Sequence, residues 1–285
     1  KFNWFYFNFT NIGDNPLVNL QVGNISPMEF ASYPNRLPQL PNLKGEVMLL
    51  KSGGGSGENS VDMSSARPGL QYFANHDLGV VYLGVSPGKL ATSVNQFLNY
   101  WGGVVVRMPD NLVKGFNGST ATIHYYTGTD TKNTGQESTS PQKAQVSNKF
   151  SRISPQINIH YQEKVDIQVA YVLGEDKNYA FVANPASSFK YSGIALEAGY
   201  MPTEEWHLGL HYDQYASNDK FTTGTNSGKA ILDYQRIVPA VTYIINQNIR
   251  GTLYYEKNIS EERKDATGKV IPLVDKLLFN IRMMF

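Results

Sequence analysis

Cysteine is absent from this chain of 285 residues. Without a thiol, the chain can form no disulfide, no thiolate metal site and no cysteine nucleophile. It also cannot attach a c-type haem covalently, because that attachment needs a Cys-x-x-Cys-His sequence. The residues of the chain therefore predict no bound cofactor and no thiolate-held metal.

Long apolar runs and charge are scarce as well. No stretch of about 18 apolar residues occurs, so no transmembrane helix is predicted. Charged residues make up 17% of the chain and the net charge is +1, which gives no reason to expect a nucleic-acid partner. The sequence lacks a secretory signal pattern and starts at Lys1 inside an apparent strand. We therefore expect a mature or truncated chain whose export signal has been removed.

The abundant residues favour strands and turns. The chain has 18 Tyr, 14 Phe and 3 Trp, which are common in strands, and 25 Gly, which suits tight turns. Its last segment, VDKLLFNIRMMF, alternates apolar and polar side chains, so one strand face is apolar and the other is largely polar. The apolar set is Leu277, Phe279, Ile281, Met283 and Phe285, and Lys276, Asn280 and Arg282 lie between them.

Four internal segments repeat this alternation: PQINIHY, VDIQVAYVL, SGIALEAGY and WHLGLHYDQY. One face carries large apolar residues, while the other carries Gly, Ala, His, Asn and charges. A membrane barrel turns its large apolar face to lipid and its small and polar face to the lumen. We expect the following residues to face lipid: Ile157, Ile159, Ile167, Leu208, Leu210, Phe279 and Ile281.

The links between the apparent strands alternate in length, which is typical of an up-and-down barrel with short periplasmic turns and long outer loops. Tyr161, Tyr200 and Trp206 lie beside short turns and fit an interfacial aromatic girdle. The short links are 11–15, 75–77, 162–164, 202–205 and 246–248, and the long ones are 27–58, 131–148, 175–188, 217–228 and 261–273.

Thirteen strands are predicted, at 1–10, 16–26, 59–75, 78–87, 97–108, 119–130, 149–162, 164–176, 189–202, 206–217, 229–245, 249–260 and 274–285. Bacterial single-chain barrels have even strand numbers, so at least one more strand is expected before Lys1 or elsewhere. The fold prediction is all-β: a single domain over 1–285 that forms a transmembrane antiparallel up-and-down β-barrel of about 14–16 strands. We place GEVMLLKS (45–52) in the first long loop, because a membrane strand there would break the up–down order.

Two segments resemble known outer-membrane proteins. The last strand, which ends at Phe285, resembles the signal by which outer-membrane barrels are recognised for insertion, and this resemblance implies an assembly role for Phe285. The segment GDNPLVNLQVGNISPMEF (13–30) is similar to the early hairpin of bacterial porins and to the barrel part of porin–cytochrome electron-transfer proteins. Both resemblances imply the outer membrane of a Gram-negative bacterium, with its lipid as a partner. Since the haem-attachment sequence is missing, a haem domain could lie only before Lys1 or on a separate c-type cytochrome partner.

Five histidines could carry chemistry: His76, His124, His160, His207 and His211. His76 lies in a short turn, whereas the other four fall on the lumen face. His207 and His211 are about 13 Å apart along one strand, too far to bind one metal directly, since metal–ligand bonds are only about 2 Å long. We interpret them as polar lumen residues, with a metal or redox-partner role as the alternative.

Charges on the lumen face fall into two groups. Asp166, Glu197 and Asp213 point inward from three successive strands, and the basic residues Arg236, Arg250, Lys276 and Arg282 point inward from the next three, with Glu256 breaking the pattern. Facing walls of opposite sign would create a transverse field across a water-filled passage. The alternative is an interior of paired charges that plugs and rigidifies the barrel. We predict that the acidic and basic residues, with His207 and His211, line the pore.

Catalysis is not expected, because no Gly-x-Ser-x-Gly nucleophile motif occurs and GGGSGE lacks the Gly-Lys-Ser/Thr ending of a phosphate loop. The first function hypothesis is a porin that passes small hydrophilic solutes or ions. The second is a barrel sheath or scaffold for a cytochrome partner in transmembrane electron transfer. The 27–58 segment has four prolines, which limit regular pairing. It is expected to be either an outer loop or a constriction loop, and a constriction favours the porin.

Overall fold

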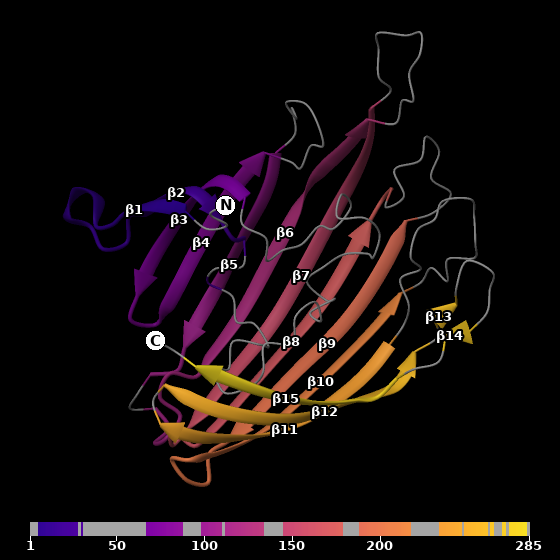
Figure 1. Cartoon of the computed structure of the whole chain (residues 1–285). Coiled ribbons are helices and arrows are strands. Elements are labelled where there is room, and N and C mark those ends of the chain that lie inside the picture. The colour runs from indigo at the N-terminus through magenta and orange to yellow at the C-terminus, as the bar shows by residue number, and fades with distance from the viewer. Residues whose placement is uncertain are drawn as a thin grey trace.

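The protein forms one curved antiparallel sheet of 13 strands, ordered by sequence from one edge to the other (Figure 1). The structure, a computed structural model, describes residues 5–27, 30, 67–87, 98–109, 112–133, 145–178, 188–217, 234–246, 248–261, 263–264, 270–271 and 274–283. Phe285, segment 45–52 and all of 27–58 except Pro27 and Phe30 lie outside these residues. The side chain of Arg282 also lies outside them, although its backbone pairs with Arg250.

All thirteen predicted strands are present. They are β1 (Phe5–Phe9), β2 (Asn19–Ile25), β3 (Arg67–His76), β4 (Gly79–Pro87), β5 (Leu98–Arg107), β6 (Thr120–Asn133), β7 (Gln145–Tyr161), β8 (Val165–Asp176), β9 (Phe189–Tyr200), β10 (Trp206–Ser217), β11 (Tyr234–Asn246), β12 (Ile249–Glu261) and β15 (Lys276–Met283). A two-stranded ribbon, β13 (Arg263–Lys264) with β14 (Val270–Ile271), lies in the last long link and was not predicted. A short 3₁₀ turn, η1 (Ile12–Asp14), follows β1. Across the described ranges, no helix has both the length and the apolar character needed to span a membrane.

Each strand of the sheet pairs antiparallel with its sequence neighbours, as the alternating link lengths predicted. With 13 strands in strict up-and-down order, β1 and β15 run in the same direction, so an antiparallel ladder cannot form directly between them. Within the described part of the chain no ladder joins these two edges, and the barrel is open at this seam.

The wall is taller on one side of the sheet than on the other (Figure 1). β1 has 5 residues and β2 has 7, whereas β6 has 14 and β7 has 17. A membrane strand needs only about 9–11 residues, so β6 and β7 extend well beyond a bilayer. This corrects the predicted 131–148 loop, because 131–133 pair with 145–147 as a continuation of the ladder. The alternation did not predict this pairing, because residues 131–133 and 145–147 are polar apart from Val146.

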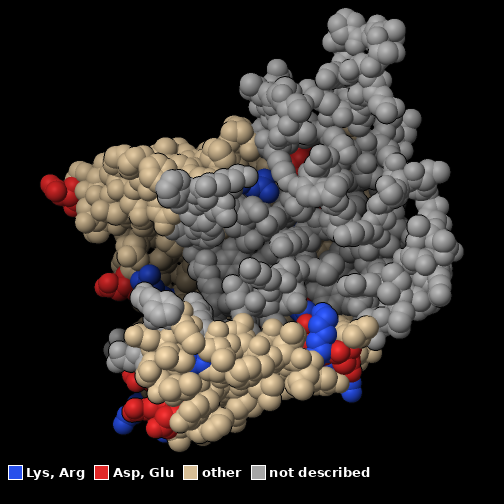
Figure 2. All heavy atoms as spheres, in the orientation of Figure 1, with Lys and Arg blue, Asp and Glu red and all other residues tan. Residues whose placement is uncertain are grey.

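The outer face of the sheet carries the large apolar side chains. All seven residues predicted to face lipid lie on this face, and Ile157, Leu208 and Phe279 are 52%, 43% and 66% exposed. At the short-turn end the rings of Trp206 and Tyr243 are 4.9 Å apart on this face, in the predicted girdle region. Figure 2 shows a band around β12 and β15 with few charged residues except toward its two ends.

The inner face contradicts one expectation, because it is not lined only by small and polar residues. Large rings from β4 to β9 point inward and are buried: Tyr82, Trp101, Tyr126, Phe150, Phe189 and Tyr191. Several of these rings lie over an inward-facing glycine of the neighbouring strand. A Cβ at Gly84 would overlap the Trp101 indole, and one at Gly174 would overlap the Tyr191 ring. Each glycine thus provides the space that a ring on the neighbouring strand occupies. The alternation of side chains along one strand does not predict which ring meets which glycine.

Replacing Gly84 with alanine should therefore destabilise the barrel. The added methyl group must displace the Trp101 indole from a packed wall, and overpacking of this kind costs about 1–3 kcal/mol. Gly251→Ala is the matched control, since its Cβ would meet only the Phe279 ring at 3.6 Å, an ordinary contact. Denaturant unfolding of the barrel refolded in detergent, followed by tryptophan fluorescence, measures both variants. Equal stability of the two would show that the ring does not need the glycine.

Candidate functional site: the inner wall and its rim pocket

The inner wall from β7 to β15 gathers the charged residues that the sequence predicted as pore-lining. Glu197, His207, His211, Asp213 and Arg236 are each at most 6% exposed there. Asp166 and Arg250 lie on the same face and are partly exposed, and Lys276 is exposed. The structure therefore brings eight of the nine predicted residues to one face, and the side chain of the ninth, Arg282, is outside the described part.

Neighbouring strands pair these charges side by side. His211 lies between two carboxylates, with its Nδ1 3.1 Å from Glu197 on β9 and its Nε2 3.6 Å from Asp213 on β10. Arg236 on β11 donates two hydrogen bonds to Asp213, of 3.0 and 2.6 Å. This bidentate geometry gives a strong and directional ion pair.

The series continues to the end of the sheet. Arg236 Nη1 is 3.8 Å from Glu256 on β12, and Lys276 Nζ on β15 is 3.3 Å from the same carboxylate. Glu256, which broke the predicted pattern, thus lies between two cations. The acidic strands and the basic strands meet at the β10–β11 boundary, where their charges compensate each other. Of the two alternatives, facing walls of opposite charge and an interior of paired charges, the geometry of these residues matches the paired charges.

A second ionic cluster, near the long-loop ends of β7 and β8, was not predicted. Arg152 and Asp176 are completely buried and form an ion pair of 2.7 Å. The Arg152 guanidinium also lies 5.1 Å from the ring centres of both Phe150 and Tyr191, a cation–π arrangement. Asn148 donates a hydrogen bond of 2.6 Å to Asp176. Side chains at every second position of β7 face inward, and Arg152 and Gln156 both belong to this set. The alternation could therefore have predicted that Arg152 faces inward.

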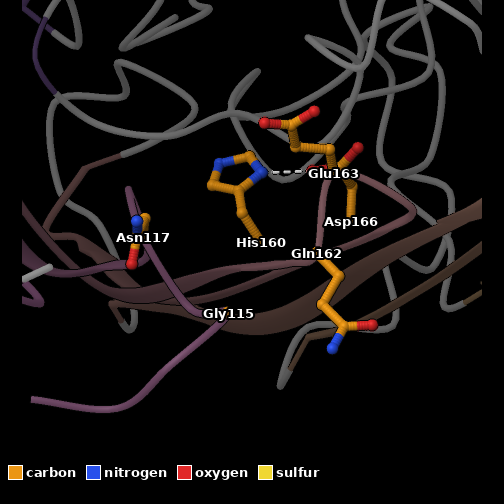
Figure 3. A pocket seen from close by; sticks show the side chains of 6 residues that line it. All are labelled: Gly115, Asn117, His160, Gln162, Glu163 and Asp166. Atoms are coloured by element: carbon orange, nitrogen blue, oxygen red, sulfur yellow. Dashed lines mark hydrogen bonds and ion pairs between the residues drawn. The ribbon is translucent and has the colours of Figure 1, made fainter. Parts of the chain in front are cut away.

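At the short-turn rim, a pocket of about 460 Å³ opens between the β5–β6 link and the β7–β8 turn. It is lined by Gly115, Asn117, His160, Gln162, Glu163 and Asp166, and Figure 3 shows His160, Glu163 and Asp166 turned toward one another. His160 Nδ1 pairs with Asp166 across β7 and β8.

Two contacts hold the link against the turn. Gln162 N donates to the Gly115 carbonyl at 2.8 Å, and the rings of Phe116 and Tyr161 lie 4.8 Å apart. The turn itself is strained, because Gln162 and Glu163 both adopt positive φ, at 49° and 56°, which is unfavourable for residues with a side chain. The pocket therefore has walls that are fixed on both sides.

The histidines fall where the alternation placed them. His76 is exposed at the end of β3, beside the β3–β4 turn, while His124, His160, His207 and His211 lie on the inner face. Tyr82 Oη and His124 Nδ1 are 2.8 Å apart, and their rings are stacked. Among the residues that the structure describes, no group of three or more His, Asp or Glu side chains could hold a metal ion.

Solved outer-membrane proteins share this architecture. OmpF of Salmonella typhi, solved in complex with daunomycin, matches with a TM-score of 0.55 at 14% sequence identity, over 94% of this chain and 75% of OmpF. In-vitro folded OmpT, an outer membrane protein of Vibrio cholerae, matches with a TM-score of 0.50 at 12% identity, over 87% of this chain and 73% of OmpT. No protein-family profile and no curated protein sequence matches the chain.

The chain thus has the fold of the bacterial outer-membrane β-barrels, which confirms the class that the alternation and the link lengths predicted. Both neighbours are outer-membrane proteins, which supports the predicted location of this chain in the outer membrane. At these levels of identity the likeness concerns the fold.

The buried Arg152–Asp176 pair should matter much more for stability than a surface pair. Arg152→Met leaves Asp176 buried without its cation, and breaking a buried pair in this way costs roughly 3–5 kcal/mol. Lys177→Met breaks a pair with Glu175 in which the lysine side chain is 61% exposed, and we expect a loss of about 0–1 kcal/mol. Denaturant unfolding compares the two variants. The double variant Arg152→Met with Asp176→Leu should recover part of the loss, and similar small losses for both single variants would contradict the role of the pair.

Proposed function

We propose that the chain forms a polar passage through the outer membrane for small hydrophilic solutes or ions, as a porin does, and that it catalyses no reaction. The observation that carries this proposal is the division between the two faces of the sheet. Charged and amide side chains occupy the inner wall from β7 to β15, and large apolar residues are exposed on the outer wall. In a bilayer, this division directs the apolar face to lipid and leaves the polar face to an aqueous interior.

The segment after β2 supports a passage narrowed by the chain itself. The Phe30 ring lies 5.0 Å from the Phe73 ring and 5.2 Å from the Tyr82 ring, both on the inner side of β3 and β4. Ile25 and Ser26, just before it, are fully buried. The chain therefore lies against the inner wall at Phe30. Of the two expectations for 27–58, this contact favours a constriction loop.

The sheath for a c-type cytochrome partner remains the competing proposal. A cytochrome threaded through the barrel would need the space on the inner wall that Phe30 contacts, so the position of Phe30 favours the passage. Barrel purified from native membranes tests the alternative by its colour. Stoichiometric haem absorption in that preparation would support the sheath, whereas a colourless barrel that conducts ions supports the passage.

The charged residues of the inner wall should set the ion selectivity of this passage. Arg250 and Lys276 are the least buried of its described cations, so their fields act on ions in water within a screening length of about 8 Å at physiological salt. In planar bilayers, Arg250→Gln with Lys276→Gln should shift the reversal potential toward cation selectivity, more strongly at low salt. Lys177→Gln with Lys190→Gln, which also removes two positive charges but from exposed sites, should change it little. If single-channel currents are absent, the proposal of a passage is wrong. If currents occur but the reversal potential is unchanged at every salt concentration, these two residues do not line it.

A further inference from the structure

Uncharged polar side chains form a contiguous patch on the inner wall next to the rim pocket. Thr122 on β6 lies directly opposite Gln156 on β7, and Asn158 on β7 lies directly opposite Gln168 on β8. We call these four residues the amide patch. Gln168 in turn lies opposite Glu197 on β9, so polar side chains continue from β6 to β9, over three strand spacings or about 14 Å.

Each member of the amide patch has a buried polar atom that makes no hydrogen bond. Among the described residues, Thr122 Oγ1, Gln156 Oε1, Asn158 Oδ1 and Gln168 Oε1 have no partner. Thr122, Gln156 and Gln168 are 5%, 3% and 6% exposed. A buried polar atom left without a hydrogen bond is unfavourable, and several in one patch are unusual in a native wall. Such a patch gains most from a molecule that offers hydrogen bonds along its length.

The patch is continuous with the pocket. His160 and Asp166 line the pocket, and they are the next inward-facing residues after Asn158 and Gln168 on the same two strands, about 7 Å away. Asn158 Nδ2 also lies 3.0 Å from His160 Nε2. The pocket therefore borders the amide patch, and a molecule seated in it would meet Asn158 first, the one member of the patch that is partly exposed.

The chemistry of the patch points to a neutral ligand with many hydroxyl groups. An amide presents a donor and an acceptor side by side, and a hydroxyl can serve either of them. Two of the nearest charged groups on the wall are in ion pairs, since His160 pairs with Asp166 and His211 with Glu197, while Glu163 at the pocket edge is exposed to water. A charged ligand would compete with these pairs, whereas a neutral one leaves them intact.

We propose that the rim pocket and the amide patch together form a binding site for a sugar or polyol within the passage. This inference rests on the proposed passage and names the class of solute that it takes. The pocket receives one end of the molecule between the β5–β6 link and the β7–β8 turn. The amide patch then binds the hydroxyl groups of the part that reaches further into the barrel.

Two matched threonine variants test the site. Thr122→Val removes a hydroxyl from the patch, and Thr242→Val removes one from the inner wall of β11, where Thr242 bonds to Thr252 at 2.9 Å. Both changes keep the shape of the side chain, and Gln168→Leu removes a whole amide group from the patch. Calorimetry with maltotriose measures binding to the barrel folded in detergent micelles, and a polyethylene glycol of matched mass serves as the ligand without hydroxyls along its chain.

We expect maltotriose to bind the unmodified barrel and polyethylene glycol not to bind it. Thr122→Val and Gln168→Leu should each weaken maltotriose binding roughly tenfold, and Thr242→Val should leave it unchanged. Absence of maltotriose binding, or equal binding by all variants, overturns the site. Gel mobility before and after heating checks that each variant is folded, and Thr122→Val decides if Gln168→Leu does not fold.

Current recordings separate this inference from the proposed function. In planar bilayers, maltotriose should reduce the ion current through the unmodified barrel and reduce it less in Thr122→Val. A barrel that binds maltotriose in the expected pattern but conducts no ions overturns the passage and retains the site. A barrel that conducts ions but does not bind maltotriose retains the passage and overturns the site.

Discussion

The pairing of backbone groups between strands is the constraint on which the rest of this structure depends. In hydrocarbon, an N–H or carbonyl group without a hydrogen bond costs several kcal/mol, so each spanning strand must pair with a neighbour on both sides. Eleven of the 13 strands do so, and β1 and β15 are the two edges. Because side chains alternate along a paired strand, this constraint also assigns every residue to the outer or the inner face.

The inner face accommodates two kinds of side chain that the alternation places there, charged groups and large rings. Charges do not stand alone there: Asp213 is bound by Arg236, Asp176 by Arg152, and Glu256 by two cations. Pairing between adjacent strands reduces the cost of removing each charge from water. Rings are accommodated differently, since Trp101 and Tyr191 lie against the wall over Gly84 and Gly174. The same register that pairs the backbone therefore also pairs ion with ion and ring with glycine.

These arrangements divide the interior along the barrel axis. Near the long-loop ends of β7 and β8, Arg152, Asp176 and the surrounding rings form a buried region. Toward the short turns, the wall carries amides and partly exposed titratable groups, and it opens into the pocket beside His160 and Asp166. Among the described residues, polar side chains that could still form hydrogen bonds with a solute lie mainly in the short-turn half. The proposed passage and the proposed sugar site both depend on this difference.

Sequence alone determined the class of fold, the thirteen strands, their order and the face of residues such as Ile157 and Glu197, because a period of two and the link lengths are local properties. Only the tertiary structure decided which side chains meet. Register between strands brings Asp213 to Arg236, which lie 23 positions apart, and places Trp101 over Gly84. The tertiary structure also places Phe30 against the inner wall. It brings the β5–β6 link to the β7–β8 turn, and the pocket forms between them. Contacts of this kind depend on the alignment of one strand against the next, and no single strand carries that alignment in its own pattern.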